Sequence, residues 1–151
     1  MERFVPIAHG VAALFAVIEL GLTAYVVTPK YYYYFLPAVV SFMLFNSIWS
    51  LLVLAYLFVT PIYFPRIFHG VVALALEWIT MIFWFGGSVG LAAHFGTPRC
   101  EGNTYCGSAQ AAIAFGFFLW VLFAFLVFVD TMAFLRGRGQ STAQPKPSVV
   151  V

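Results

Sequence analysis

The sequence predicts an all-α membrane protein that folds as a bundle of four transmembrane helices. Of its 151 residues, 64% are hydrophobic and only 8% are charged, whereas about a quarter of the residues in a soluble domain are charged. Four long apolar segments each reach the roughly 20 residues that a helix needs to cross the hydrocarbon of a bilayer. None of them alternates polar and apolar residues as the strands of a membrane barrel do.

The four predicted spans are separated by short connections. They cover about residues 6–27, 37–59, 67–95 and 109–135. The first starts close to the N-terminus, but its apolar run is longer than that of a signal peptide and no small-residue cleavage site follows, so we expect a retained helix. The third and fourth are long enough to tilt or to project beyond the lipid. Pro61 and Pro65, in the connection of residues 60–66, predict a tight antiparallel hairpin of the second and third spans.

Residues 1–135 are therefore predicted to form one transmembrane domain, and residues 136–151 to form a tail. The tail is polar, contains Gly and Pro, and lacks a helical period except in its last three valines. Such a segment cannot bury enough apolar surface to offset the entropy lost on ordering, so we expect it to be disordered.

The distribution of Lys and Arg predicts the orientation of the bundle, because cytosolic loops carry an excess of these residues. With four spans, both termini share a side with the connection between the second and third spans. That side holds five basic residues and the opposite side holds two. The five are Arg3, Arg66, Arg136, Arg138 and Lys146, and the two are Lys30 and Arg99. We therefore expect both termini, and the tail, in the cytosol.

Cys100 and Cys106 are the two cysteines of the chain, and both lie in the connection on the predicted outer side. The compartment there is oxidising, so a disulfide between them is the simplest expectation. Closing so short a loop stabilises the fold by roughly 2 kcal/mol in the chain-entropy account. Gly102 and Asn103 are typical turn residues, and Ser108 is the expected N-cap of the fourth helix. Without a neighbouring His or further Cys, the pair is a poor zinc site.

Four polar residues lie inside the predicted spans, namely Glu19, Asn46, Glu77 and Asp130. A charge at the centre of a transmembrane helix costs roughly 3 kcal/mol on insertion scales, so such residues are expected to face the interior of the bundle. Counted from the span ends, Glu19, Asn46 and Glu77 are expected at similar depth, with Glu19 and Asn46 within reach of a hydrogen bond. Asp130 is expected near the cytosolic end, level with His9 in the first span.

Two roles remain open for the intramembrane glutamates. The favoured role is structural: a neutral, protonated carboxyl group that joins helices through hydrogen bonds. The alternative is a functional carboxylate, in proton-coupled transport or in the binding of a lipid headgroup. Small multidrug transporters have four spans and one essential glutamate in the first, and Glu19 is similar in position. The cysteine-bearing connection and the cytosolic tail depart from that pattern.

Gly86, Gly87 and Gly90, together with Ser88, give the third span a face of small side chains. Gly86 and Gly90 form a Gly-x-x-x-Gly pair, and such pairs let helix backbones approach closely. Packing within the bundle is the favoured use of this face. Dimerisation, or docking onto a larger membrane complex as an accessory subunit, is the alternative.

The sequence lacks the motifs of common enzymes and cofactor sites. No His-Glu-x-x-His, Gly-x-Ser-x-Gly or Walker-type loop is present. The three histidines show no metal-ligand spacing, so neither a metal nor a cofactor is predicted. The net charge of +2 is thinly spread, without the basic cluster that neutralises phosphates, which argues against nucleic acid as a partner. We therefore predict that the protein is not an enzyme.

The segment "YCGSAQAAIAFGFFLWVLF", Tyr105 to Phe123, resembles the start of the fourth span in fungal MARVEL-domain proteins, especially the non-classical export protein family. In that family a cysteine shortly precedes Ala-Gln-Ala, and an Ala-Phe pair and an aromatic run follow. The matching positions here are Cys106, Ala109, Gln110, Ala111, Ala114, Phe115, Phe117, Phe118 and Trp120. The number of spans and the cysteine-bearing second outer loop extend the resemblance over most of the chain.

The resemblance implies a MARVEL-like tetraspan of the plasma membrane with no enzymatic activity. Such a protein organises lateral membrane domains, the eisosome-associated furrows of fungal cells, with a link to sphingolipids, or acts in membrane traffic. The partners that it implies are membrane lipids, with sphingolipids as candidates, and other membrane proteins or further copies of the chain. Flat aromatic rings next to small glycines make a sterol a further candidate.

Overall fold

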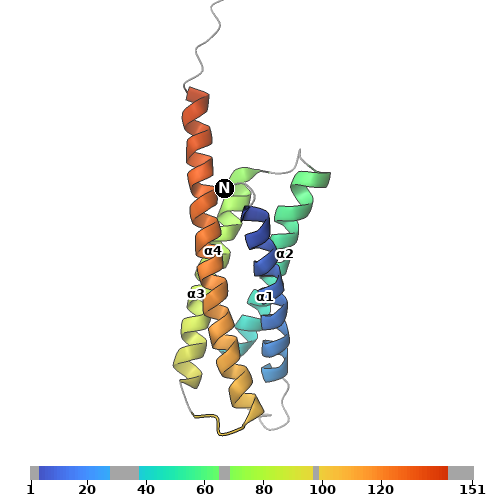
Figure 1. Cartoon of the computed structure of the whole chain (residues 1–151), viewed down its shortest axis with the longest axis vertical. Coiled ribbons are helices and arrows are strands. Elements are labelled where there is room, and N and C mark those ends of the chain that lie inside the picture. Colours follow the sequence, from blue (N-terminus) through green and yellow to red (C-terminus); the bar gives the residue numbers. More distant parts are fainter. Residues whose placement is uncertain (1–3, 28–37, 65–68, 97–98, 143–151) are drawn as a thin grey trace, which may run out of the picture.

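In this computed structural model, the described part of the chain consists of four long helices and contains no strand. The structure describes residues 4–27, 38–64, 69–96 and 99–142. The helices are α1 (Phe4–Val27), α2 (Ala38–Tyr63), α3 (Gly70–Phe95) and α4 (Thr104–Thr142) (Figure 1). All four are long and apolar enough to cross a membrane. The predicted fold class, a bundle of four transmembrane helices, is therefore confirmed.

The helices form a ring in which each packs against two neighbours. α1 contacts α2 and α4, and α3 contacts the same two helices, so α1 and α3 face each other diagonally across the bundle. Successive helices run in opposite directions (Figure 1). As a consequence, the start of α1, the end of α2, the start of α3 and the later part of α4 lie at one end of the bundle. We call it the N-terminal end.

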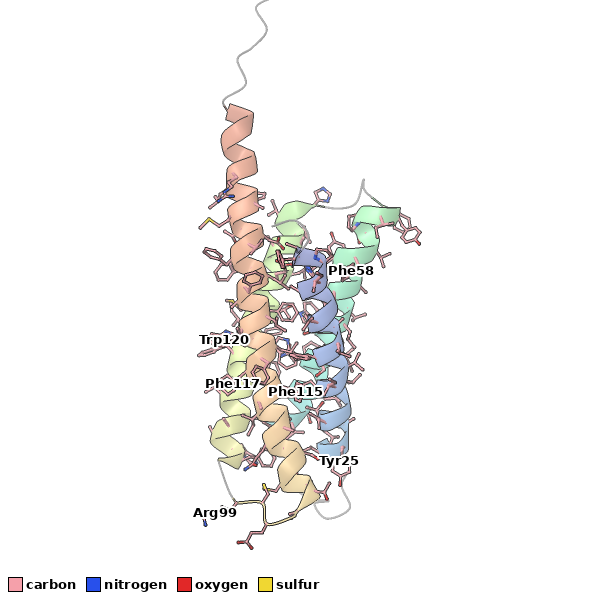
Figure 2. The ribbon with its side chains drawn as sticks, viewed as in Figure 1. Tyr25, Phe58, Arg99, Phe115, Phe117 and Trp120 are labelled. Atoms are coloured by element: carbon pink, nitrogen blue, oxygen red, sulfur yellow. A yellow bond between two sulfur atoms is a disulfide. The ribbon has the colours of Figure 1, made fainter. Side chains whose placement is uncertain are left out.

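The outer surface of the bundle is apolar on every helix. In the most apolar 18-residue stretch of each helix, only 28% to 33% of the residues are buried. Side chains project outward from all four helices (Figure 2). The large apolar ones that are more than half exposed include Ile7, Leu52, Ile82 and Phe118. Soluble proteins rarely expose apolar surface of this extent, whereas helices that are hydrophobic all round suit a bilayer.

α4 extends beyond the predicted fourth span. Its 39 residues correspond to about 58 Å of helix, well beyond the roughly 30 Å of hydrocarbon, and it projects past the other helices at the N-terminal end (Figure 1). The structure corrects the prediction of a disordered tail for residues 136–142, which continue the helix. Extending an existing helix needs no new nucleus, so Gly137 and Gly139 do not end it. Residues 143–151 of the predicted tail lie outside the described residues.

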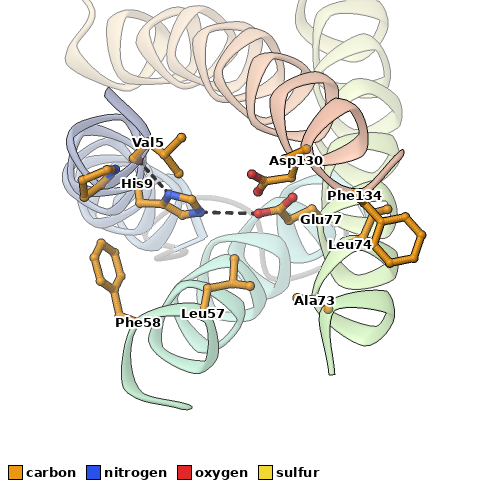
Figure 3. A pocket seen from close by; sticks show the side chains of 12 residues that line it. Val5, His9, Leu57, Phe58, Ala73, Leu74, Glu77, Asp130 and Phe134 are labelled. Carbon is orange, nitrogen blue, oxygen red and sulfur yellow. Dashed lines mark hydrogen bonds and ion pairs between the residues drawn. The ribbon is translucent and has the colours of Figure 1, made fainter. Parts of the chain in front are cut away.

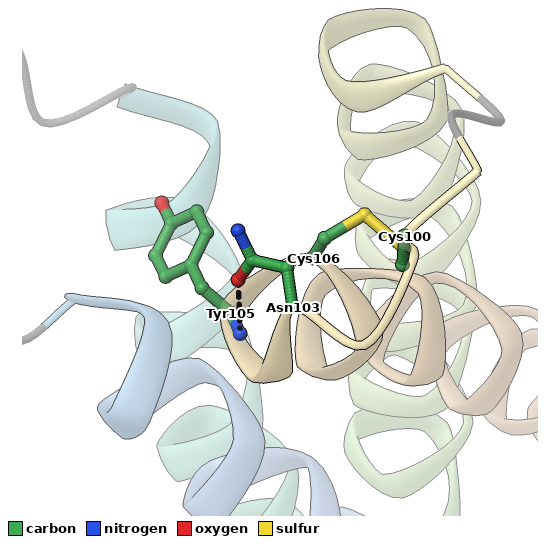
Figure 4. Close-up of a disulfide and its surroundings, with 4 residues drawn as sticks. All are labelled: Cys100, Asn103, Tyr105 and Cys106. Atoms are coloured by element: carbon green, nitrogen blue, oxygen red, sulfur yellow. Dashed lines mark hydrogen bonds between the residues drawn. A yellow bond between two sulfur atoms is a disulfide. The ribbon is translucent and has the colours of Figure 1, made fainter.

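α4 also begins earlier than predicted, five residues before residue 109. Asn103 is its N-cap in place of the expected Ser108, since Asn103 Oδ1 accepts a hydrogen bond from the backbone N–H of Tyr105 at 3.0 Å (Figure 4). The chain reaches this cap through a turn in which Glu101 and Gly102 have positive φ angles of 35° and 83°. Asn and Ser cap helices equally well, so the turn decides which of them is used.

α2 continues through Pro61 to Tyr63 and therefore ends later than the predicted residue 59. Proline removes one backbone donor, and near the end of a helix this loses a single intrahelical hydrogen bond. The last turn is closed by a hydrogen bond of 2.8 Å from the Phe64 N–H to the Thr60 carbonyl. Residues 65–66, the remainder of the predicted hairpin connection, lie outside the described residues.

The predicted small face of α3 points in two directions. Gly87 faces α2, where an added Cβ would lie 2.5 Å from the Met43 sulfur and 3.3 Å from the Phe42 ring. Gly90 also faces α2. Gly86 points away from the bundle, where an added Cβ would meet no described atom within 4 Å. Gly86 and Gly90 therefore do not form one contact surface, and Gly87 is the glycine that close packing requires.

Replacing Gly87 with Val is expected to lower the free energy of unfolding by about 1–3 kcal/mol, the usual cost of overpacking a core. Gly86→Val is the matched control, because it adds the same side chain one residue away, on the outward face. Thermal unfolding of both purified variants in detergent micelles measures the difference. Equal loss in the two variants would contradict the assignment of the packing face.

Cys100 and Cys106 form the predicted disulfide, with their Cα atoms 5.5 Å apart (Figure 4). Replacing both with Ser is expected to lower the free energy of unfolding by about 2 kcal/mol, because the unfolded chain regains the freedom of a short closed loop. The measurement is the unfolding midpoint with and without a reducing agent. The reductant should bring the wild-type midpoint down to that of the double variant and leave the variant unchanged. A midpoint that does not respond to reduction would show that the loop adds no stability.

Candidate functional site

A cavity of about 420 Å³ lies between the four helices at the N-terminal end of the bundle (Figure 3). Its walls are mostly apolar, with Leu57 and Phe58 contributed by α2 and Leu74 by α3. Three polar side chains line it as well, His9 from α1, Glu77 from α3 and Asp130 from α4. An apolar pocket with a few convergent polar groups is the usual form of a binding site.

His9 is held in one orientation by two polar contacts. Its Nδ1 lies 2.8 Å from the carbonyl oxygen of Val5, one turn earlier in α1. A carbonyl accepts hydrogen bonds only, so Nδ1 carries a proton. Its Nε2 points across the bundle and lies 3.4 Å from Glu77 Oε1. The ring makes an edge-to-face contact with Phe58, with the ring centroids 5.6 Å apart.

Glu77 and Asp130 complete the cluster. One ligating atom from each of His9, Glu77 and Asp130 lies within 4.8 Å of the other two, and Figure 3 shows the three side chains pointing toward one another. Glu77 is 1% exposed, and its Oε2 has no hydrogen-bond partner among the described residues. The site therefore joins diagonal helices α1 and α3 through the centre of the bundle.

The sequence predicted Asp130 to lie level with His9, and the structure places both in this cluster. The predicted depth of Glu77, beside Glu19 and Asn46, differs from the structure. α1 and α3 run in the same direction, so the depths of their residues in the bundle can be compared by counting residues from the start of each helix. Glu77 is seven residues after the start of α3 (77 − 70), His9 five after the start of α1 (9 − 4) and Glu19 fifteen (19 − 4). Glu77 accordingly lies beside His9.

A second polar region occupies the middle of the bundle. Glu19 and Asn46 are both 0% exposed. The expected hydrogen bond between them is not formed, and neither side chain has a partner in the described ranges. Asn46 lies one turn before Ser50, whose hydroxyl donates to the Asn46 carbonyl at 2.8 Å and accepts from Trp84 Nε1 at 2.8 Å. Trp49 Nε1 likewise donates to Thr80 Oγ1 at 3.1 Å.

Sequence reasoning missed these Trp contacts as well as the cavity. The available signal was the spacing of polar residues by one helical turn, as in Asn46 and Ser50, which marks the inward face of α2. Which Trp would reach that face could not be told from the sequence, since all four helices are apolar around their circumference.

The aromatic motif residues of α4 contact both neighbouring helices, since Phe115 meets Phe15 of α1 and Trp120 meets Phe85 of α3. Ala109 is 2% exposed and belongs to the buried core, whereas Gln110 and Ala111 are half-buried. The ring of Phe115 meets Phe15 of α1 edge-on, with centroids 5.3 Å apart. In this structure the motif therefore supplies small and aromatic side chains to helix–helix contacts.

Comparison with protein families matches residues 5–129 to MARVEL, described as a membrane-associating domain. The chain belongs to the MARVEL family. The match covers α1, α2, α3 and most of α4, and it ends one residue before Asp130. Comparisons with curated proteins and with solved structures found no match. The bundle is thus a membrane-associating MARVEL tetraspan.

Proposed function

We propose that this MARVEL protein is a non-enzymatic tetraspan of the plasma membrane that organises lateral membrane domains. The observation that carries the proposal is the match to a membrane-associating domain over residues 5–129. The apolar outer surface supports it, because all four helices present large exposed side chains to lipid. The proposed partners are membrane lipids, other membrane proteins and further copies of the chain.

The finer assignment is to the fungal non-classical export family, with its link to eisosomes and sphingolipids. It rests on the resemblance of the segment from Tyr105 to Phe123, above all the spacing of Cys106 and Gln110. The cytosolic location of both termini rests on the excess of basic residues on their side, five against two.

An aromatic cluster on α2 and α3 is the proposed contact for a lipid with a flat ring system, such as a sterol. Phe45 and Trp49 stack with their ring centroids 6.1 Å apart. The ring centroid of Phe83 lies 5.6 to 6.5 Å from those of Phe42, Phe45 and Trp49. Phe45 is 49% exposed, so the cluster reaches the surface. Flat rings gain dispersion energy against a rigid planar ligand.

Imaging a fluorescently tagged copy in a fungal cell tests the proposed function. The expected result is a patchy distribution at the plasma membrane that changes when sphingolipid synthesis is inhibited. Uniform distribution, or retention in the endoplasmic reticulum, would contradict the proposal. Exchanging Phe45 and Phe83 for Leu should weaken the patches, and the same exchange at Phe125 and Phe128 on α4 is the control for lost aromatic surface.

A small proton-coupled transporter is the second candidate, and the polar cluster on the cavity favours it. Intramembrane carboxyl groups that line a cavity are common in proton relays. Glu77 lines this cavity, whereas Glu19 does not. In reconstituted vesicles with a pH gradient, transport of a cationic substrate should be lost in Glu77→Gln and kept in Glu19→Gln. Absence of transport by the wild type across a panel of such substrates would reject this candidate.

A further inference from the structure

The cluster of His9, Glu77 and Asp130 places three ionisable side chains between the helices of a membrane bundle. Apolar side chains of similar size would pack there without the cost of burying ionisable groups. The three residues come from three different helices, and their ligating atoms converge within 4.8 Å. They also line the cavity, so a small ligand has room beside them.

The orientation of His9 is the one that a metal ligand requires. Its Nδ1 donates to the Val5 carbonyl, which leaves Nε2 as the nitrogen that faces the carboxyl groups. In metal sites, a histidine ligand almost always donates its other N–H to a carbonyl or carboxylate, which fixes the tautomer and the ring orientation. In neutral His9 the Nε2 lone pair points toward Glu77 Oε1 at 3.4 Å, and two acceptors in that position need a proton or a cation between them.

Glu77 provides the second, independent indication of a ligand. Its side chain is 1% exposed, and Oε2 has no hydrogen-bond partner in the part of the chain that the structure describes. A buried carboxyl oxygen without a partner costs about 1–3 kcal/mol, more when it is charged. The carboxyl group lies on the cavity and beside Asp130 (Figure 3), so a bound cation would use the oxygen that the protein leaves unpaired.

We propose that His9 Nε2, Glu77 and Asp130 bind a divalent first-row transition-metal cation of the Zn²⁺ type. A divalent cation fits the charge of the cluster. Two carboxylates and one neutral imidazole carry two negative charges, which a divalent cation neutralises. A single imidazolium would leave one negative charge, so a second proton on a carboxyl group would be needed in the absence of the cation. In a low-dielectric bundle the neutral combination is strongly preferred.

The donor set indicates the class of metal. Imidazole nitrogen suits Zn²⁺ and its neighbours, whereas Ca²⁺ and Mg²⁺ prefer sites built from oxygen atoms alone. Three protein ligands with a fourth position left open for water or another small ligand is a known arrangement of zinc in proteins. Metal–ligand bonds of about 2.0–2.1 Å place tetrahedral ligand atoms about 3.3 Å apart. The ligating atoms of the cluster lie within 4.8 Å of one another, so each pair would move closer by roughly 1.5 Å at most on binding.

Cation binding by the full-length chain tests the proposal. The protein is purified with its affinity tag removed and is stripped with a chelator in detergent micelles. It is then titrated with Co²⁺ followed by visible absorption, and with Zn²⁺ in competition. The expected result is one ion per chain, with a tetrahedral cobalt spectrum that Zn²⁺ abolishes. His9→Gln, Glu77→Gln and Asp130→Asn should each weaken binding by at least roughly tenfold. Loss of a residue that only hydrogen-bonds to a metal ligand already lowers metal affinity by about that factor.

Two control variants separate this site from other sources of binding. Glu19→Gln changes a buried carboxyl group outside the cluster, and His69→Gln removes a histidine at the same end of the bundle. Both should bind Co²⁺ with wild-type affinity and spectrum. Circular dichroism checks that each variant folds. The proposal is overturned if the folded wild type shows no saturable binding, or if folded Glu77→Gln and Asp130→Asn keep the wild-type spectrum. Because binding is measured in vitro, its failure leaves the imaging test of membrane organisation unaffected.

Discussion

Replacing Trp84 with Ala is expected to lower the free energy of unfolding by about 3–5 kcal/mol, the usual cost of truncating a buried aromatic side chain. Trp84 is 0% exposed and is among the largest fully buried side chains in the described bundle. Its indole N–H donates to Ser50 at 2.8 Å. In lipid the bundle is held by dispersion contacts and interhelical hydrogen bonds, and this change removes both. Unfolding by denaturing detergent, followed by circular dichroism, measures the loss.

Trp78→Ala on the same helix is the matched control. Trp78 is 45% exposed on the outer surface, where substitutions usually change the free energy of unfolding by about 0.5 kcal/mol or less. Trp84→Phe separates the two contributions, because it keeps an aromatic ring and removes the hydrogen bond to Ser50, which is worth about 1 kcal/mol. If Trp78→Ala proved as damaging as Trp84→Ala, the described core would be misplaced.

The four spans could be predicted because the length of an apolar run is set by the thickness of the membrane and needs no knowledge of packing. The inward faces could be predicted in part, because polar residues avoid lipid. Glu19, Asn46 and Glu77 are indeed between 0% and 1% exposed. The apolar residues give no such guidance, since a helix that is apolar all round has no preferred face in the sequence.

The candidate site could not be assembled from the sequence for two reasons. Its residues come from three helices, so their spacing along the chain carries no metal-ligand pattern. Their meeting also depends on the depth of each helix, which shifts when a helix begins or ends a few residues from the expected place. α4, for example, begins five residues before residue 109, because the turn at Glu101 and Gly102 places Asn103 rather than Ser108 at the cap.

The two buried glutamates are expected to respond with opposite sign to the same substitution. Glu19→Met should raise the free energy of unfolding by about 1–3 kcal/mol, because it removes a fully buried carboxyl group that has no hydrogen-bond partner among the described residues. Glu77→Met should lower it by about 1–3 kcal/mol, because His9 Nε2 then loses its polar partner inside the bundle. Thermal unfolding of both metal-free variants at one fixed pH measures the two changes.

The signs show whether each glutamate stabilises the bundle through interhelical hydrogen bonds. Interhelical hydrogen bonding, the role that the sequence favoured for both residues, requires a loss of stability in each variant. A gain in Glu19→Met would mean that Glu19 does not hold the bundle together, and that its buried carboxyl group without a partner lowers the stability of the fold. A loss in Glu19→Met as large as that in Glu77→Met would instead show that Glu19 has a polar partner in the membrane and would restore the structural role.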